Sequence, residues 1–430
     1  MTPIKKSKPT YIVNVIGFMN DLEFRVDTNL QSVLQSAKYI LMSKTNHLRL
    51  KPLVNLTNKQ VHYFGHDYFK SLEEFAKLPS NKVIIATGDP GYFGALRSIR
   101  YYFSDHKIIS YPAKTSVSLA FSVLGETWDD ATVISTLGRP IFSVLNAIAQ
   151  SLKTAILCSK QLPPNKLGKL LIEHVEVNWL HSRDFYTVYN LHSDPIVSKH
   201  SIESLIDVTV NYDSILLILP KNSNKLLDSL PHHSLGPSLI ASNLKVISPV
   251  FGEPVEDFLA VGSMITKPEV RAVILSKLAP QNYCTLLEVG AGSGSISIEA
   301  IKLAPLMRVI SFEKDPTAYE NLKGNMKSHN VVFETHLSDF YKYKRTLPKA
   351  DRILIGGGKL DQFDRLLNVA NPNATIVGTF ASLDRAQKLA KILGNLVQIN
   401  INTGKTFTDG TMHLVANNPV FIVWGQFNSI

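Results

Sequence analysis

The chain lacks the features expected of secreted, zinc-binding and membrane-spanning proteins. Only two cysteines are present, Cys158 and Cys284, and neither has a partner in a C-x-x-C pair, so we expect no disulfide framework and no metal site. No apolar run approaches the roughly 20 residues that cross a bilayer. The short apolar segment 11–18 is followed by Asp21 and Glu23, which favours a first β-strand over a signal peptide. We therefore expect a cytoplasmic protein.

Charge of one sign is not concentrated anywhere in the chain. The 45 Lys and Arg residues outnumber the 35 Asp and Glu residues, giving a formal net charge of +10. This favours an anionic partner, whether nucleic acid, a membrane surface or a polycarboxylate substrate, and a basic surface that aids solubility explains it equally. The lysines are scattered and form no run long enough for a nucleic-acid arm. We expect neither nucleic acid nor a membrane as partner.

The most informative segment present is 286–295, an apolar run that ends in Glu and alternating glycines. It predicts a strand that turns tightly into a helix, whose free N–H groups face a ligand seated on the turn. A dinucleotide fingerprint would need Gly at position 295, where Ser295 stands, so the pattern suits an adenosyl ligand without a pyrophosphate. The next apolar run ends in Glu313, which can accept both ribose hydroxyls. Together these features indicate S-adenosylmethionine, whereas a glycine-rich turn of any α/β domain is the alternative that Glu313 disfavours.

The 430 residues, 45% of them hydrophobic, predict a globular protein of two or three domains. Residues 10–220 alternate β-branched runs with helical patterns and predict one α/β domain. The polar stretch 221–249 is the best linker. This stretch contains His232-His233, but no carboxylate or cysteine stands at metal-ligand spacing from them. Residues 250–430 are expected to form a second α/β unit. No internal repeat is present, so the two halves are expected to have different folds.

Strands of the first half are expected at 11–17, 38–42, 83–87, 107–111, 132–136, 154–158 and 214–219, and helices at 28–37, 91–103, 114–124, 141–151 and 165–174. Strands of the second half are expected at 284–289, 308–313, 331–336, 351–355, 374–380, 396–402, 411–417 and 419–425, and helices at 267–279, 294–304, 316–328, 359–370 and 382–393. The last two strands flank Asn417-Asn418-Pro419, which predicts a hairpin-like turn and a doubly wound sheet closed by an antiparallel hairpin.

Three further motifs surround the glycine turn. Gly356-Gly357-Gly358 ends a strand and either leaves room for a bulky substrate or is a flexible turn. In the segment 264–271, a capping box explains Thr266, Pro268 and Glu269 but not Arg271, which could equally be a surface charge. The loop 404–412 could present Lys405 to a carboxylate.

Residues 251–425 closely resemble the family of C15-methylating, C12-decarboxylating methyltransferases of cobalamin (precorrin) biosynthesis. The motifs that carry the resemblance are 252–258, 264–271, 286–295, 351–358, 409–412 and 418–420. The resemblance implies that S-adenosylmethionine contacts Thr266, Gly290, Ala291, Gly292, Ser293, Gly294 and Glu313. It also implies a small residue near the adenine, which falls at Leu337 or Ser338, where His336-Leu337-Ser338 replaces the usual Gly-Asp-Ala of the family.

The first half carries a second set of motifs. An apolar strand breaks on Gly88-Asp89-Pro90-Gly91, which forces a sharp loop and on its own is a common turn. With the segments 111–116 and 135–140, its order resembles the tetrapyrrole methylase fold of the C5-methylating precorrin-6Y enzymes. The resemblance implies that Gly88, Asp89, Pro90, Thr115 and Ser116 enclose S-adenosylmethionine, with Gly138 close by. The first loop, 17–20, keeps a single Gly, and Pro112-Ala113 replaces the usual Pro-Gly, so we expect a first site that is active but altered, or partly degenerate.

The two resemblances occur fused in the family of decarboxylating precorrin-6Y C5,15-methyltransferases. They imply methylation of precorrin-6Y/6B at C5 and C15 with loss of carbon dioxide from the C12 acetate, to give precorrin-8, and a homo-oligomer. Few strictly catalytic side chains are expected, since methyl transfer depends mainly on alignment. We expect substrate carboxylates at Lys267, Arg271 and Lys405, with Gly356 and Gly357 lining the substrate site. The alternative is an RNA or protein methyltransferase whose first half is a non-catalytic scaffold.

Overall fold

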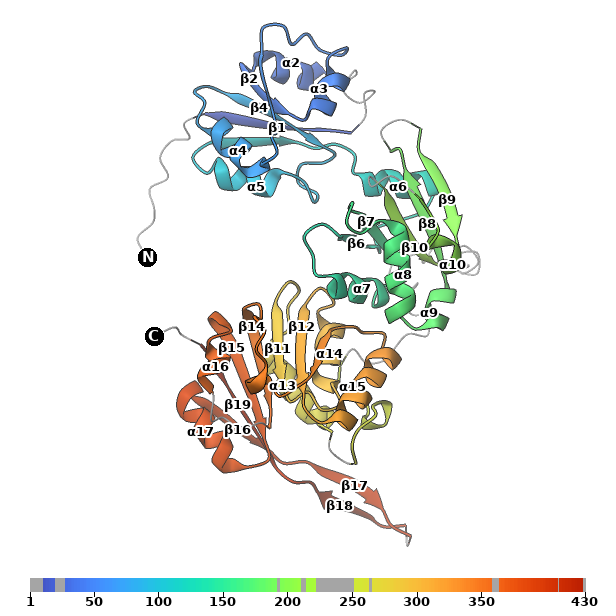
Figure 1. Ribbon diagram of the computed structural model, residues 1–430, viewed down its shortest axis with the longest axis vertical. Helices are drawn as coiled ribbons and strands as arrows, with labels where there is room; N and C mark the ends of the chain where they lie inside the picture. Colours follow the sequence, from blue (N-terminus) through green and yellow to red (C-terminus); the bar gives the residue numbers. More distant parts are fainter. Residues whose placement is uncertain are drawn as a thin grey trace.

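The computed structural model describes residues 11–19, 28–191, 194–209, 214–221, 251–262, 265–357, 363–408 and 410–427. Nearly all of the expected linker 221–249, including His232-His233, lies outside these ranges. Three sheets follow one another along the chain, and a two-stranded ribbon projects from the last (Figure 1). The first two sheets belong to the half before the expected linker, and the third sheet and the ribbon to the half after it.

The first sheet is parallel, with strand order β3-β2-β4-β1-β5. Short β-branched runs form its strands, and helices between them cover hydrophobic clusters on the sheet. The strands are β1 (Ile12–Phe18), β2 (Tyr39–Met42), β3 (Gln60–Tyr63), β4 (Lys82–Thr87) and β5 (Lys107–Tyr111), and the helices are α2 (Thr28–Ser36), α3 (Lys44–Leu50), α4 (Tyr68–Ala76) and α5 (Leu96–Tyr102). The helix expected at 91–103 thus begins only at Leu96, because the glycine-rich loop continues past Gly94.

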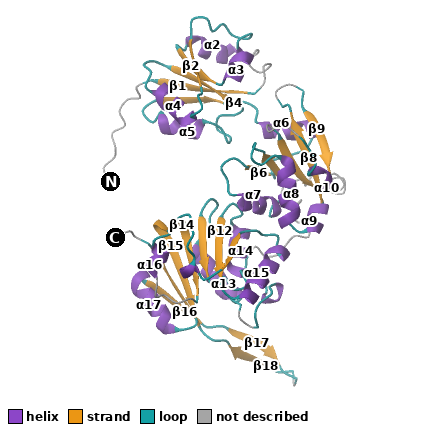
Figure 2. Cartoon of the chain, in the orientation of Figure 1, coloured by secondary structure: helices purple, strands orange, loops and turns teal. Residues whose placement is uncertain are grey.

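The second sheet is mixed, with order β6-β7-β10-β8-β9, and only β6 and β7 pair in parallel. Its strands are β6 (Thr132–Ser135), β7 (Thr154–Leu157), β8 (Arg183–Tyr189), β9 (Ile196–His200) and β10 (Ile215–Pro220). Its helices are α6 (Ser116–Leu124), α7 (Ile141–Ala149), α8 (Pro164–His174), α9 (Val177–His181) and α10 (Ile202–Leu205). The first half of the chain therefore contains two sheets, each with its own helices, where the sequence predicted one α/β domain (Figure 2).

The third sheet has seven strands in the order β13-β12-β11-β14-β15-β19-β16, and only β19 runs against the others. This is the doubly wound arrangement expected from the sequence. Its strands are β11 (Thr285–Val289), β12 (Arg308–Glu313), β13 (Glu334–Leu337), β14 (Ala350–Gly356), β15 (Ala370–Phe380), β16 (Asn395–Ile399) and β19 (Val420–Gln426), and its helices are α13 (Pro268–Leu278), α14 (Ser295–Leu303), α15 (Pro316–Ser328), α16 (Phe363–Leu367) and α17 (Leu383–Leu393). Two single 3-10 turns, η1 (Val255–Asp257) and η2 (Phe340–Lys342), complete it.

The prediction of a hairpin between the last two strands is wrong. β18 (Met412–Ala416) pairs with β17 (Asn402–Thr406) in a separate ribbon, whereas β19 pairs with β15 and β16. The Asn-Asn-Pro turn leads the chain from the ribbon back into the sheet. The strand expected at 396–402 is accordingly split between β16 and β17.

A close junction joins α7 to the third sheet (Figure 1). The side-chain amide of Asn146 donates to the Val332 carbonyl at 2.8 Å, and its oxygen accepts from the Val332 N–H at 2.7 Å. Ser143 Oγ donates to the Met307 carbonyl at 3.1 Å. Met307 and Val332 precede β12 and β13, so the junction lies at the strands' amino ends. The opposite, carboxyl edge of the sheet is where ligands bind in this kind of fold, and it faces away from the first half.

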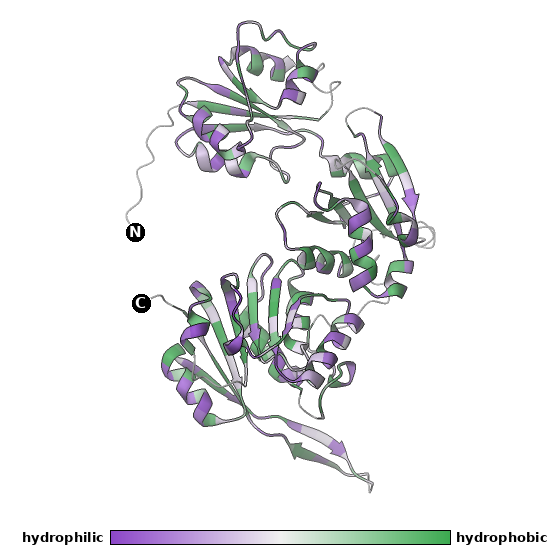
Figure 3. Ribbon diagram, viewed as in Figure 1, coloured by the Kyte–Doolittle hydropathy of each residue, from purple (hydrophilic) through white to green (hydrophobic). Residues whose placement is uncertain are grey.

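None of the helices in the described ranges is long and apolar enough to cross a membrane. Hydrophobic residues instead gather on the strands of the sheets (Figure 3). The ribbon is an exception, because Met412 and Leu414 on β18 are each 73% exposed.

Candidate active site

The glycine turn follows β11 and has the conformation that its glycines allow. Gly290, Gly292 and Gly294 have φ values of 81°, 57° and 75°, and Gly294 caps the amino end of α14. A Cβ on Gly290 would lie 2.6 Å from the Gly356 carbonyl oxygen, and one on Gly356 would lie 2.3 Å from the Gly290 oxygen. The two loops therefore touch through their backbones, and no side chain fits between them.

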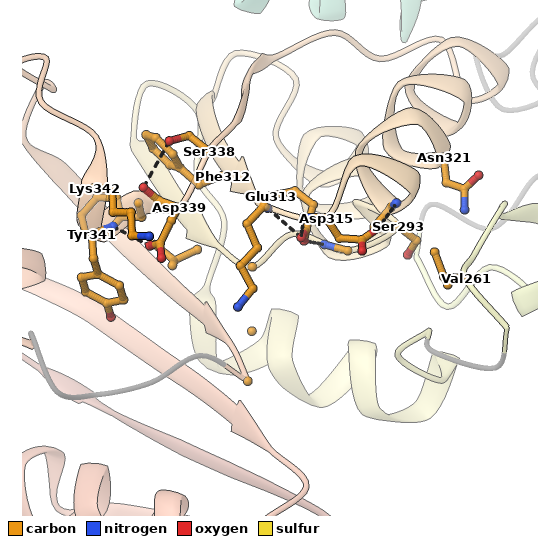
Figure 4. Close-up of a pocket in the computed structure, with 18 of the residues that line it drawn as sticks. Val261, Ser293, Phe312, Glu313, Asp315, Asn321, Ser338, Asp339, Tyr341 and Lys342 are labelled. Atoms are coloured by element: carbon orange, nitrogen blue, oxygen red, sulfur yellow. Dashed lines mark hydrogen bonds between the residues drawn. The ribbon is translucent and has the colours of Figure 1, made fainter.

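Glu313 ends β12, and its carboxylate lies directly on the glycine turn. Its Oε2 accepts from the Gly292 N–H at 2.8 Å, and its Oε1 accepts from the N–H groups of Lys314 and Asp315, also at 2.8 Å. The side chain is buried but borders a cavity (Figure 4). Three N–H donors fix the orientation of this carboxylate. Because a carboxylate has about four acceptor positions, one position on Oε2 stays open.

Two cavities meet at the glycine turn. The first, here the β12 cavity, measures about 640 Å³ and is lined by residues that include Glu313, Asp315, Ser338, Asp339 and Lys342. The second, here the α13 cavity, measures about 550 Å³ and is lined by residues that include Thr266, Lys267, Glu288, Thr379 and Asn418. Both reach Gly290, Gly292, Ser293, Gly356 and Gly357. These volumes suit small-molecule ligands, and the two cavities share a wall at the glycine turn.

Most of the residues predicted from the second half line these cavities. Thr266, Lys267 and Ala291 border the α13 cavity, and Ser338 borders the β12 cavity. Leu337 is 49% exposed and lies outside both linings, so Ser338 is the residue that the structure brings to the site. Whether these residues bind a ligand stays a prediction.

Arg271 does not reach the site, and the prediction that it binds substrate is wrong. Its side chain is 0% exposed, and its Nε donates to Glu299 Oε1 at 2.9 Å. Its other nitrogens donate to the carbonyls of Thr266 and Glu253. A guanidinium enclosed in this way cannot meet a ligand, and it instead ties α13 to α14 and to the segment before α13.

Lys405 lies on β17 of the ribbon, outside the linings of both cavities. The sequence predicted a loop at 404–412, but the first residues of that stretch are strand, and the ribbon carries them away from the sheet (Figure 1). This placement argues against contact with a ligand in either cavity of the same chain.

Sequence reasoning missed several polar residues of the β12 cavity, among them Asp315, Asp339 and Lys342. Asp315 and Asp339 each cap the helical turn that follows a strand, Asp315 by accepting from the Ala318 N–H and Asp339 from the Tyr341 N–H. Figure 4 shows Asp315 on the same side as Glu313, and Asp339 and Lys342 across the cavity. The available signal was an Asp two or three residues after a predicted strand, at the start of a helical turn.

Glu288 is fully buried behind the glycine turn, and burial raises the pKa of its carboxyl to about 7. The hydroxyl of Ser297 donates to it and lowers the pKa, while the negative charge of Glu313 raises it further. The group therefore carries a proton over much of the range in which an unfolded Glu has lost it.

We predict that folding stability of the second half falls as the pH rises from about 4.5 to about 7. Over that range the folded chain keeps the Glu288 proton that the unfolded chain releases, which amounts to about 3 kcal/mol. Glu288→Gln should remove this pH dependence, measured by urea unfolding at several pH values. If the free energy of unfolding changed equally with pH in the variant and in the parent chain, the prediction would be contradicted.

The candidate residues of the first half form a second cluster of loops. Gly17, at the end of β1, would place a Cβ 2.7 Å from the Gly88 oxygen, 2.8 Å from Ala113 Cβ and 2.9 Å from Pro90 Cδ. Gly88 has φ 68° and donates to the Phe18 carbonyl. The loops after β1, β4 and β5 therefore meet at one edge of the first sheet.

The remaining candidates of the first half take part in local turns. Asp89 Oδ1 accepts from the Gly91 N–H at 2.7 Å, and Thr115 caps α6, whose first residue is Ser116. A capping box with Ser118 explains Thr115 without a ligand. Gly138 lies apart from these loops along the chain, in an exposed turn after β6 at φ 69°. Ligand contact at these residues also stays a prediction.

Comparison with known proteins bears on what this site does. A family model described as a precorrin methyltransferase domain matches residues 257–424. A Sinorhizobium protein named precorrin-6Y C(5,15)-methyltransferase (decarboxylating) is 25% identical over 415 residues, 93% of this chain and 94% of that protein. A Pyrobaculum aerophilum protein named probable cobalt-precorrin-6B C(15)-methyltransferase (decarboxylating) is 31% identical over 185 residues, 40% of this chain and 94% of that protein. The chain belongs to the precorrin methyltransferases.

This precorrin methyltransferase is therefore an enzyme, and the family resemblance carried by its motifs is confirmed. A solved structure titled precorrin-6y C5,15-methyltransferase, from Geobacter metallireducens, is 30% identical and covers 41% of this chain and 98% of its own, with a TM-score of 0.37. The matched residues 257–424 contain the glycine turn, Glu313 and the strands that carry them.

Proposed function

We propose that the second half, residues 250–430, transfers a methyl group from S-adenosylmethionine to C15 of a precorrin and removes carbon dioxide from the C12 acetate. The observation that carries this is the Glu313 carboxylate held on the glycine turn at 2.8 Å from the Gly292 nitrogen. The relatives named above supply the substrate class. A tetrapyrrole with several carboxylates also suits a chain of net charge +10.

The residues present fit S-adenosylmethionine. Gly292 and Gly357 line both cavities, and a Cβ on either would have nothing within 4 Å, so bare backbone is available to a ligand there. The open acceptor position on Glu313 suits one ribose hydroxyl, and Ser338 and Asp339 border the same cavity. When bound, this cofactor supplies an electrophilic methyl group.

The chain's own residues align the reactants and exclude water rather than act as strong bases. The α13 cavity takes the precorrin, with Lys267 placed to pair with a substrate carboxylate. Gly356 and Gly357 border both cavities and leave space for the reacting carbon. Glu288 borders the α13 cavity behind the turn, and a cationic ligand beside it would favour the charged form of its carboxyl.

The first half, residues 10–220, methylates C5 in this proposal, with a site among the loops after β1, β4 and β5. Its support is the Sinorhizobium relative, which matches the chain over 93% of its length and whose name includes both positions. The close approach of Gly17 to Gly88, Pro90 and Ala113 brings the motif loops together and supports a site among them.

The intact chain is tested with precorrin-6Y and S-adenosylmethionine by mass spectrometry. The product should carry two added methyl groups and lack one carbon dioxide. Glu313→Gln should weaken binding of the methyl donor to the second half by about tenfold to a hundredfold, because it removes a charged hydrogen-bond acceptor. Decarboxylation should fall with it, whereas the other methylation should persist.

The matched control is Glu320→Gln on α15, because the Glu320 side chain is 67% exposed and pairs with Lys323 on the same helix. It should behave as the parent chain. Methylation of RNA or protein without reaction of precorrin-6Y would overturn the proposal.

We also propose that the chain forms a homo-oligomer in the cytoplasm. The ribbon supports self-association, because a two-stranded hairpin is marginally stable alone in water and this one exposes Met412, Leu414, Val415 and Phe407. A reducing compartment suits the free thiols of Cys158 and Cys284.

A further inference from the structure

Arg139 lies between aromatic rings from two distant parts of the chain. Its guanidinium is 5.6 Å from the ring centre of Phe93, in the loop after β4, and 4.9 Å from that of Tyr283, just before β11. Its Nη1 also donates to the Tyr283 hydroxyl at 3.1 Å. Arg139, in the loop after β6 of the second sheet, therefore contacts both the loop after β4 of the first sheet and the second half of the chain.

Both aromatic partners have an unusual backbone. Phe93 has φ 51° and Tyr283 has φ 71°, the left-handed region that large side chains rarely adopt. Such conformations persist only where the surroundings hold them, and they concentrate at functional positions. The side chains are nevertheless 46% and 68% exposed, so burial in a core does not explain them.

Arg139 has no carboxylate partner among the residues that the structure describes. Its guanidinium contacts the two rings and the Tyr283 hydroxyl, and it directly follows Gly138. Phe93 belongs to the same tight loop as Gly88, Asp89 and Pro90, where Gly94 packs against the Asp89 and Pro90 carbonyls. Fixing Phe93 therefore restrains the loop that carries the predicted cofactor residues.

Tyr283 is held in place independently of Arg139. Its N–H donates to the Leu306 carbonyl, and the carbonyl of the next residue, Met307, accepts from Ser143 of α7 at 3.1 Å. Tyr283 precedes β11, at the edge of the sheet opposite to the glycine turn. A change at Tyr283 should therefore leave the second half's own site intact.

We propose that Arg139 and Tyr283 are positioning residues for the first site. Through their stack with Phe93, the second half of the chain holds the 88–94 loop in the shape needed for methyl transfer by the first half. The inference rests on the proposed C5 methylation by the first half, and it makes that site incomplete without the second half.

The test uses full-length chains with Tyr283→Ala, Tyr283→Phe, Arg139→Ala and Arg139→Lys. In Tyr283→Ala, the KM for the methyl donor in the methylation carried out by the first half should rise about tenfold. The reason is that the change removes a cation–π contact and a hydrogen bond. Carbon dioxide release by the second half should stay at the parent rate. Arg139→Ala should behave alike, and Tyr283→Phe and Arg139→Lys should each restore part of the loss.

Hydrogen exchange supplies a readout that does not depend on activity. The amides of residues 91–94 should exchange faster in Tyr283→Ala, although the change lies in the other half of the chain. Leu383→Ala, which truncates a 43% exposed side chain on α17, is the control and should change neither readout.

Parent-like exchange and parent-like KM in Tyr283→Ala would overturn the inference. Faster exchange in Tyr283→Ala, with a parent chain that adds only one methyl group, would instead preserve the structural coupling and overturn the proposed C5 activity.

Discussion

Arg271→Ala should destabilise the second half by about 3–5 kcal/mol, because it leaves the buried Glu299 carboxylate without its cation. Both side chains of this pair are 0% exposed. Glu299 also accepts from the N–H groups of Gly252 and Glu253 at 3.0 Å, so the loss spreads to the segment before α13. Urea unfolding of the parent and variant chains measures the difference.

A double variant separates loss of the charge pair from loss of volume. Arg271→Met combined with Glu299→Gln removes both charges and keeps most of the packing, so it should be clearly more stable than Arg271→Ala. If Arg271→Ala instead unfolded like the parent chain and only weakened binding of precorrin, the ligand role first inferred from sequence would be restored.

The charge of a residue in a sequence does not reveal whether its side chain faces a cavity or the core. Arg271 and Lys267 belong to one motif, yet Lys267 borders the α13 cavity and Arg271 faces the core. The two lie four residues apart, across the start of α13, and the burial of Arg271 depends on its ion pair with Glu299 of the next helix. Contacts between helices of this kind leave no local pattern.

The glycine turn and Glu313 were predictable for the opposite reason. Parallel strands place their carboxyl ends at one edge, so a glycine run after β11 and an acid at the end of β12 had to meet. The Oε2 of Glu313 does lie 2.8 Å from the Gly292 nitrogen. Local motifs on adjacent parallel strands therefore carry enough information to assemble a site.

Antiparallel pairing was harder to predict. β8 and β9 were not expected. No residue of β9 is buried, and β8 finds its central partner, β10, about 30 residues further along the chain, so neither strand has a clear local signal. The short strand β3 and helix α4 were missed too. The ribbon was mistaken for part of the sheet because the turn at 417–419 resembles a hairpin, while β19 finds its partners in β15 and β16.

Gly290→Ala should abolish most of the second half's methyl transfer. The new Cβ would stand 2.6 Å from the Gly356 carbonyl oxygen, a backbone atom that cannot rotate away, and φ 81° adds strain of about 1–2 kcal/mol for any side chain. The two loops must separate, and a misplacement of about 1 Å in a site costs about a hundredfold in rate. The expected result is a loss of about a hundredfold or more in carbon dioxide release and in affinity for S-adenosylmethionine.

Gly394→Ala is the matched control, because Gly394 has φ 89° at the end of α17 but nothing within 4 Å of its missing Cβ. It carries the same backbone strain without the clash and away from the cavities, so it should lower stability slightly and leave affinity unchanged. Calorimetry with the methyl donor and product analysis measure both variants. If Gly290→Ala lost no more affinity than Gly394→Ala, contact between the 290 and 356 loops would not shape the site, and the cofactor would have to be placed elsewhere.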